Sequence, residues 1–241
     1  MLSKSQLKLI TSLYQKKYRN KHLLFVVEGI KTVNEFLDSD FNLHSLFCTS
    51  NFSHQLAEDK VEIVSNAELK KISCLKNPNE VLGLFQIPEK KSIDTSKFTI
   101  VLDEINDPGN LGTIIRLCDW FGAHQLICSQ DTVDCFNPKV VQASMGSLTR
   151  INLQYVDILD FLAKTDLPIY TAMMDGENVY QKPLDKEAVL VMGNEANGIS
   201  EKVQQLITQK ISIPRFGDLQ QTESLNVATA TAILLSEFKR S

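Results

Sequence analysis

The stretch AVLVMGNEANGI, residues 188–199, decides the fold class of this 241-residue chain. Its first five residues are apolar and are typical of a buried strand. A loop follows at once, in which Gly193 and Gly198 flank an acid, Glu195, and two amides. Ligands of open α/β sheets bind at the carboxyl ends of strands, so this loop is a candidate binding site. Asn-Gly is also ordinary turn chemistry, which leaves a purely structural loop as the alternative.

Strands and helices alternate on both sides of this stretch. Short apolar runs are followed by helical spacing of apolar residues, which predicts a mostly parallel sheet covered by helices on both faces. We expect strands at residues 98–102, 125–128, 168–172, 188–192 and 211–213, and helices at 111–121, 138–147, from 200 onward and at 224–239.

The amino-terminal part predicts a second, smaller α/β unit. A polar stretch with a leading proline, residues 88–97, is typical of a linker. We therefore expect two domains, residues 1–92 and 97–241. The elements expected in the first domain are helices at 5–18, 30–38 and 66–74, and strands at 23–27, 43–48, 61–64 and 81–86.

Two further loops follow predicted strands. The first, Asp107–Gly112, leads into a helix that carries Arg116. Its glycines let backbone approach a ligand closely, and Asn110 can cap the helix or bind a polar group. The loop is neither a dinucleotide-binding glycine fingerprint nor a phosphate-binding P-loop. A surface arginine on an ordinary helix is the alternative interpretation.

The other loop begins at Ile213-Pro214 and ends at Ser224-Leu225-Asn226, where a helix rich in Ala and Thr starts. Small residues let such a helix pack its backbone closely against another element, within or between subunits. Taken alone, this segment is better explained as a well-capped terminal helix.

Charge is distributed unevenly along the chain, whose net charge is −4. Residues 1–92 hold 13 Lys/Arg against 10 Asp/Glu, whereas residues 93–241 hold 12 against 19. Within residues 1–31, seven basic residues, Arg19 among them, accompany one acid. This bias indicates phosphate contacts with a nucleic acid or, equally, a solvated helix face.

The cysteines form neither a CxxC pair nor a Cys/His cluster, so the sequence predicts free thiols and no metal site. No apolar run approaches the roughly 18 to 20 residues that span a bilayer. The first 21 residues lack the apolar core of a signal peptide, and we expect a cytoplasmic protein. The five cysteines are Cys48, Cys74, Cys118, Cys128 and Cys135.

The three loops, in this order, resemble the three motifs of SpoU/TrmH-type RNA 2′-O-ribose methyltransferases, members of the SPOUT superfamily. The resemblance covers residues 97–241, and the segments Phe136–Val141 and Ala143–Ser147 add to it. Residues 24–29, LFVVEG, look like the RNA-binding domain often attached to these enzymes. That domain is similar in fold to small kink-turn-binding ribosomal proteins.

The resemblance implies a catalytic domain with a carboxyl-terminal trefoil knot that binds S-adenosylmethionine. Backbone atoms of Gly193, Ile213 and Leu225 would hold the cofactor, and Thr171 would add a contact at the edge of a strand. Neighbouring positions of the implied cofactor site are Met192, Asn194 and Gly198.

The resemblance also implies methyl transfer to a ribose 2′-oxygen of RNA. Such a hydroxyl ionises far above neutral pH, so its proton must be removed or the developing alkoxide stabilised. The family's usual account makes Arg116 the base. Because a guanidinium group holds its proton strongly, we favour a charged Arg116 that stabilises the alkoxide. The implied catalytic positions are Asn110, Arg116, Glu195, Ser224 and Asn226.

The implied partners are RNA, with ribosomal RNA favoured over transfer RNA, and a second copy of the chain in a homodimer. The third motif departs from the family's Ile-Pro-Met, because Arg215 follows Pro214 and the gap to Ser224 is longer. A non-catalytic RNA-binding or ribosome-assembly protein with the same fold is the main alternative. A Rossmann-type nucleotide enzyme is disfavoured, since no glycine fingerprint follows the first strand.

Overall fold

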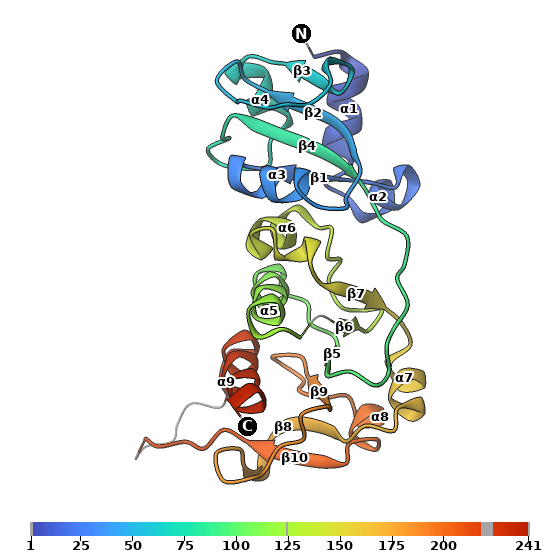
Figure 1. The fold of residues 1–241 in the computed structure, drawn as a ribbon, viewed down its shortest axis with the longest axis vertical. Coiled ribbons are helices and arrows are strands. Elements are labelled where there is room, and N and C mark those ends of the chain that lie inside the picture. Colours follow the sequence, from blue (N-terminus) through green and yellow to red (C-terminus); the bar gives the residue numbers. More distant parts are fainter. Residues whose placement is uncertain (1, 124, 218–223, 241) are drawn as a thin grey trace. The chain divides into compact units, whose positions relative to one another are not determined.

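The fold is described from a computed structural model that covers residues 2–123, 125–217 and 224–240 (Figure 1). The chain divides into two compact units. The first contains Met1–Glu89 together with Asp134–Thr149, and the second contains Lys90–Val133 and Arg150–Ser241. Within the described ranges, no helix is long and apolar enough to cross a bilayer.

The first unit is built on a sheet of four described strands in the order β1-β4-β2-β3. β4 pairs antiparallel with β1 and β2, whereas β2 and β3 are parallel. Apolar residues of α1 and α4 pack with the sheet in one buried cluster. The elements are α1 (Lys4–Ser12), α2 (Lys16–His22), β1 (Leu24–Glu28), α3 (Ile30–Leu37), β2 (Leu43–Cys48), a 3₁₀ turn (Glu58–Lys60), β3 (Val61–Ile63), α4 (Asn66–Ile72), β4 (Val81–Gln86), α6 (Pro138–Ser144) and a second 3₁₀ turn (Ser147–Thr149).

The second unit contains six described strands in the order β10-β8-β9-β5-β6-β7. Every strand pair described in this sheet is parallel, which confirms the predicted fold class. The elements are β5 (Thr99–Leu102), α5 (Pro108–Phe121), β6 (Gln125–Cys128), β7 (Asn152–Tyr155), α7 (Ile158–Lys164), β8 (Ile169–Asn178), β9 (Val189–Met192), α8 (Glu201–Gln204), β10 (Gln209–Ser212) and α9 (Val227–Arg240).

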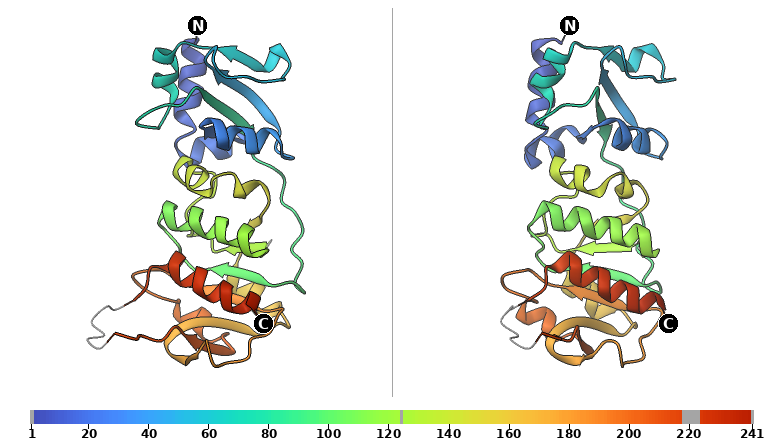
Figure 2. Two further views of the ribbon diagram at one scale, coloured as in Figure 1. Left: turned by 60° about the vertical axis from the view of Figure 1, so that its left-hand side comes forward. Right: turned by 90° about the vertical axis from the view of Figure 1, so that its left-hand side faces the viewer.

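Helices cover both faces of this sheet. On one face, Val101 and Val191 pack in a cluster with Phe161 of α7 and Val203 of α8. Alternate strand residues point the other way, and there the Phe238 ring of α9 lies 5.2 Å from the Tyr170 ring of β8. α9 lies beside α5 on this second face (Figures 1 and 2). The central strand β9 is therefore buried, as its apolar sequence predicts.

Two predicted helices are shorter in the structure. The helix expected at 5–18 is divided into α1 and α2. The helix expected at 138–147 ends at Ser144, because Met145 and Gly146 adopt positive φ angles of 52° and 91°. A left-handed residue after the last helical turn ends a helix.

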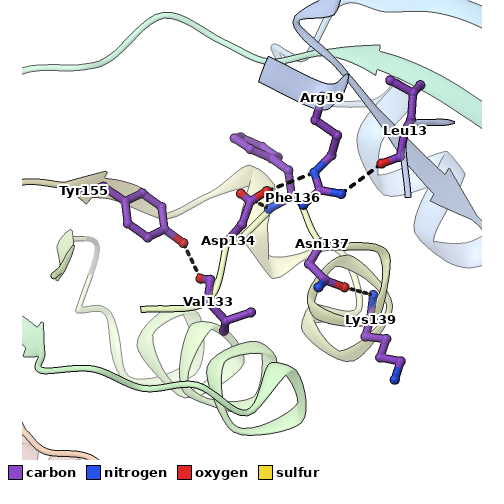
Figure 3. A network of polar contacts seen from close by, with 8 residues as sticks. All are labelled: Leu13, Arg19, Val133, Asp134, Phe136, Asn137, Lys139 and Tyr155. Atoms are coloured by element: carbon purple, nitrogen blue, oxygen red, sulfur yellow. Dashed lines mark hydrogen bonds and ion pairs between the residues drawn. The ribbon is translucent and has the colours of Figure 1, made fainter. Parts of the chain in front are cut away.

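The segment Asp134–Thr149 belongs to the first compact unit although its neighbours in sequence belong to the second. The predicted domain ranges place it with residues 97–241. Arg19, only 2% exposed, donates from Nε and Nη2 to Asp134 Oδ2 at 2.9 and 2.5 Å, and from Nη1 to the Leu13 carbonyl oxygen (Figure 3). The Phe136 ring lies 4.6 Å from the Phe25 ring of β1. Side-chain packing and a buried ion pair therefore build this segment into the amino-terminal unit.

Candidate functional site

Three polar side chains from the three predicted loops meet in the second unit. Asn110 Nδ2 donates to Glu195 Oε1 at 2.5 Å, and Asn226 Nδ2 donates to Asn110 Oδ1 at 2.9 Å. These bonds join residues that are 85 and 116 positions apart in the sequence. The three loops therefore meet at one place, as the sequence interpretation requires.

The sheet order explains why these loops meet. β5 and β9 are parallel neighbours, so the loops that follow them leave the same edge of the sheet. Helix capping then orients the amides. The Asp107 side chain accepts from the Asn110 backbone N–H at 2.8 Å, and Asn226 Oδ1 accepts from the backbone N–H groups of Ala228 and Thr229.

The loop after β9 is folded tightly on itself. Asn194 and Gly198 exchange two backbone hydrogen bonds of 2.9 Å, and Asn194 Nδ2 donates to the Glu104 carbonyl oxygen at 2.7 Å. A Cβ atom at Gly193 would lie 2.5 Å from the backbone of Gly198. Since carbon atoms pack at about 3.5 to 4.0 Å, only glycine fits at Gly193.

A cavity of about 1430 Å³ lies at the carboxyl ends of β9 and β10 and beside the middle of β8, residues 172–175. It exceeds the roughly 300 to 1,000 Å³ of ordinary small-molecule sites. Its wall includes most of the predicted cofactor positions together with two predicted catalytic residues. These predicted residues are Met192, Gly193, Asn194, Glu195, Gly198, Ile213, Ser224 and Leu225.

Four predicted residues are not among the described residues that line this cavity. Thr171 is fully buried and donates from Oγ1 to the Val191 carbonyl oxygen at 3.0 Å, so its next neighbour, Ala172, lines the cavity instead. Asn110 and Asn226 contact the cavity residue Glu195 directly or through each other. Arg116 is exposed on α5 and is not among the described residues of the cavity wall.

The sequence interpretation missed Met174 and Phe216, which line the cavity rim and are exposed. Arg215 also lines the rim and is exposed, and the sequence had singled it out as a departure from the family's third motif. Nothing in the local pattern predicts that the middle of β8 borders the same rim.

No cysteine is among the described residues that line this cavity. Cys48, Cys118, Cys128 and Cys135 are buried, and Cys74 is exposed. Burial raises the pKa of the Cys118 thiol. Although residue Cys74 is exposed as a whole, its sulfur is partly buried and hydrogen-bonded to the Glu28 carboxylate, which raises the pKa of Cys74 to about 12. These two thiols stay protonated near neutral pH, which disfavours them as nucleophiles.

Comparison with known proteins agrees with this geometry. The profile of the SpoU rRNA Methylase family matches residues 97–236, and that of the MRM3-like substrate binding domain matches residues 4–83. The 23S rRNA (guanosine(2553)-2′-O)-methyltransferase RlmP of Bacillus subtilis is 30% identical over 92% of this chain and 91% of its own.

Solved structures share the whole fold. A TrmH-family protein from Porphyromonas gingivalis superposes with a TM-score of 0.91 and 37% identity, over 100% of this chain and 99% of its own. An rRNA methyltransferase from Sinorhizobium meliloti superposes with a TM-score of 0.84 and 29% identity, over 100% of this chain and 96% of its own. With its catalytic-domain profile, full-length relatives and converging motif loops, the chain belongs to the SpoU rRNA methylase family.

Proposed function

We propose that this protein transfers the methyl group of S-adenosylmethionine to a ribose 2′-hydroxyl of ribosomal RNA. The observation that carries the proposal is the hydrogen-bonded chain Glu195–Asn110–Asn226 beside the cavity, because it joins all three family motifs at one place. The relative from Bacillus subtilis, named as a 23S rRNA 2′-O-methyltransferase, supports this substrate class.

The cavity fits S-adenosylmethionine, which when bound supplies a methyl group on a positively charged sulfur. An AdoMet-bound rRNA methyltransferase from Sinorhizobium meliloti, 28% identical with a TM-score of 0.85, supports this cofactor. Gly193 lets the loop backbone close on itself, while Ile213 and Leu225 add apolar walls. The Glu195 carboxylate places negative charge at the wall of a site that must hold a cation.

Replacing Gly193 with alanine tests this cofactor site. The added methyl group would overlap the Gly198 backbone, and the loop must move by about 1 Å to restore ordinary carbon contact distances. We expect the affinity for S-adenosylmethionine, measured by titration calorimetry, to fall at least about tenfold. Thermal unfolding of the same variant shows whether the affinity falls because the loop moves or because the whole domain is destabilised. Unchanged affinity would remove the loop from the cofactor site.

The catalytic residues act on the ribose hydroxyl. In this proposal Asn110, Glu195, Ser224 and Asn226 orient the ribose and its neighbours. A charged Arg116 stabilises the ribose 2′-oxygen as this oxygen gives its proton to solvent water and bonds to the methyl group, whose bonding electrons stay with the sulfur. Holding the reacting oxygen in line with the methyl group contributes roughly 7 to 11 kcal/mol in well-aligned systems.

A homodimer explains how Arg116 reaches a cavity that it does not line. Trp120, four residues further on the same helix, is 83% exposed. Exposed tryptophans are common at the centres of protein interfaces. We infer that the outer face of α5 packs against a second copy and that each copy supplies Arg116 to its partner's cavity.

The trefoil knot also belongs to the proposal. The connection between Gly217 and Ser224 lies outside the described residues. Support for the knot comes from the Asn226–Asn110 bond and the side-by-side packing of α9 with α5. A crystallographic trace in which the last segment fails to pass through a preceding loop would contradict it.

The basic amino-terminal helices are the proposed RNA-binding surface. Arg19 is buried in its ion pair and is therefore excluded from phosphate contacts, whereas Lys16, Lys17 and Lys21 of α2 are exposed. Each phosphate contact contributes about −0.7 to −0.9 to the slope of log affinity against log salt.

Exchanging Lys16, Lys17 and Lys21 for glutamine should weaken RNA binding about tenfold or more and lower the salt slope by about 2. Filter binding to unmodified 23S rRNA at several salt concentrations measures both. A matched triple variant, Lys164→Gln with Lys186→Gln and Lys202→Gln, changes net charge equally in the acidic half. If both triples weaken binding alike, α2 is not the RNA-binding surface.

Mapping 2′-O-methyl groups in total RNA with and without this protein tests the function itself. One ribosomal ribose that loses its methyl group supports the proposal. A lost transfer RNA site would change the substrate, and an unchanged map would favour the non-catalytic alternative. A ribosomal RNA substrate also supports the predicted cytoplasmic location, which fractionation of cells would test.

A further inference from the structure

The segment after β10 presents an aromatic ring at the mouth of the cavity. Phe216 lines the cavity and is nevertheless 82% exposed. Two other apolar side chains of the same rim, Met174 and Leu225, are 63% and 49% exposed. An apolar rim that remains open to solvent is typical of a surface that a ligand covers.

The charge of the cavity wall points to the ligand. The described wall residues that carry charge are Asp175, Glu195 and Arg215. Asp175 pairs with Lys210 at 3.0 Å, and Arg215 Nη2 lies 3.7 Å from Met174 Sδ on the rim. Arg215 is thus the single cation of the described wall, and it stands next to the exposed ring. A phosphodiester that enters between two carboxylates needs such a partner.

The size of the cavity leaves room for this second component. At about 1430 Å³ it is larger than ordinary sites for one small molecule. The buried wall residues Met192, Ile199 and Val227 mark its inner part, while the Arg215–Phe216 rim borders solvent. The inner part suits the cofactor, and the rim suits the nucleotide that carries the acceptor hydroxyl.

We propose that Phe216 stacks on a base of the substrate RNA at the cavity mouth and that Arg215 binds the adjacent phosphate. This inference rests on the proposed function, and it assigns RNA contacts to the second unit in addition to α2. Stacking on an aromatic side chain tolerates every base, because every base has a π-face. Phe216 therefore contributes affinity and positioning, and sequence preference comes from elsewhere.

The full-length Phe216→Ala variant tests the inference with unmodified 23S rRNA as the probe. Loss of one stacked base weakens RNA binding about 5- to 150-fold. We expect the KM for RNA to rise within this range and the affinity for S-adenosylmethionine to stay within about twofold. Phe216→Tyr should keep most of the wild-type affinity for RNA. Tyr180→Ala removes an aromatic residue that is 40% exposed and not among the described wall residues, and it should change neither value.

A spectroscopic signature separates stacking from a merely structural role. The chain has one tryptophan, Trp120, so the wild-type protein is the reference for Phe216→Trp. Stacking on a base should quench the added emission when RNA is titrated, whereas S-adenosylmethionine alone should leave it unchanged. Arg215→Ala should lower RNA affinity and the salt slope by about 0.7 to 0.9, with partial rescue by Arg215→Lys.

Three results would overturn the inference. The first is equal RNA affinity in Phe216→Ala and wild type. The second is a lower affinity of Phe216→Ala for S-adenosylmethionine with unchanged RNA binding. The third is a changed oligomeric state of Phe216→Ala in sedimentation. The second result would make Phe216 a cover for the cofactor, and the third an interface residue. If wild-type protein transfers no methyl group to any RNA, the proposed function fails instead, and quenching by RNA still reports on the stacking.

Discussion

Replacing Arg116 with alanine is expected to lower methyl transfer about 1000-fold while leaving the affinity for S-adenosylmethionine within about twofold. Arg116 is exposed on α5 and is not among the described residues of the cavity wall, so its loss leaves the cofactor site intact. Single-turnover transfer to 23S rRNA and calorimetry with the cofactor measure the two effects. Arg116→Lys keeps the charge without the planar fork and should recover only part of the rate.

Mixing variants shows whether Arg116 acts across subunits. A heterodimer of Arg116→Ala with Gly193→Ala combines one intact cavity with one intact arginine on the other chain. The test uses a cofactor concentration that saturates wild type but not Gly193→Ala. If each copy supplies Arg116 to its partner, the mixture transfers methyl groups faster than either parent. If Arg116 acts within its own chain, the mixture is no faster than Gly193→Ala alone. Lost cofactor affinity in Arg116→Ala would contradict the catalytic role altogether.

The second large effect is expected in the first unit. Arg19→Ala should lower the free energy of unfolding by about 3 to 5 kcal/mol, because it leaves the Asp134 carboxylate, 14% exposed, without its charged partner. Urea unfolding, and hydrogen exchange of the β1 amides, report on this unit. Lys16→Ala removes an exposed cation from the neighbouring helix and should change stability by less than about 0.5 kcal/mol.

The double variant Arg19→Leu with Asp134→Leu checks the cause. Replacing both charges with apolar groups removes the desolvation cost, so the pair should be more stable than either single variant. If the double variant loses as much stability as the Arg19→Leu and Asp134→Leu losses added together, the two side chains are not coupled.

The sequence predicted the local elements that carry the site because their signals are short in range. The apolar run of β9, the proline and caps of α5, and the small residues of α9 each specify their own element. Strand alternation with helices then predicted the parallel sheet. The adjacency of Asn110, Glu195 and Asn226 came from the family resemblance, since hydrogen bonds between residues 85 and 116 positions apart leave no local pattern.

Other features depend on tertiary packing and could not be predicted. The excess of basic residues around Arg19 suggested phosphate contacts. In the structure Arg19 is buried and pairs with Asp134, which is 115 positions away in the sequence. The orientation of Thr171 could not be predicted either. Successive side chains of a strand point to opposite faces of the sheet, so the register of β8 decides whether Thr171 or Ala172 borders the cavity. That register is set by the pairing of β8 with β9 and β10.

The placement of Asp134–Thr149 has a consequence for the exchange of parts between related enzymes. A recombination event at the linker alone would separate Arg19 from Asp134 and Phe25 from Phe136, and both chimeric products would expose surfaces that are buried here. Swapping substrate recognition therefore requires moving residues 134–149 along with the amino-terminal part. By the same reasoning, a protease that nicks the linker should yield two bands under denaturing conditions but one particle in gel filtration.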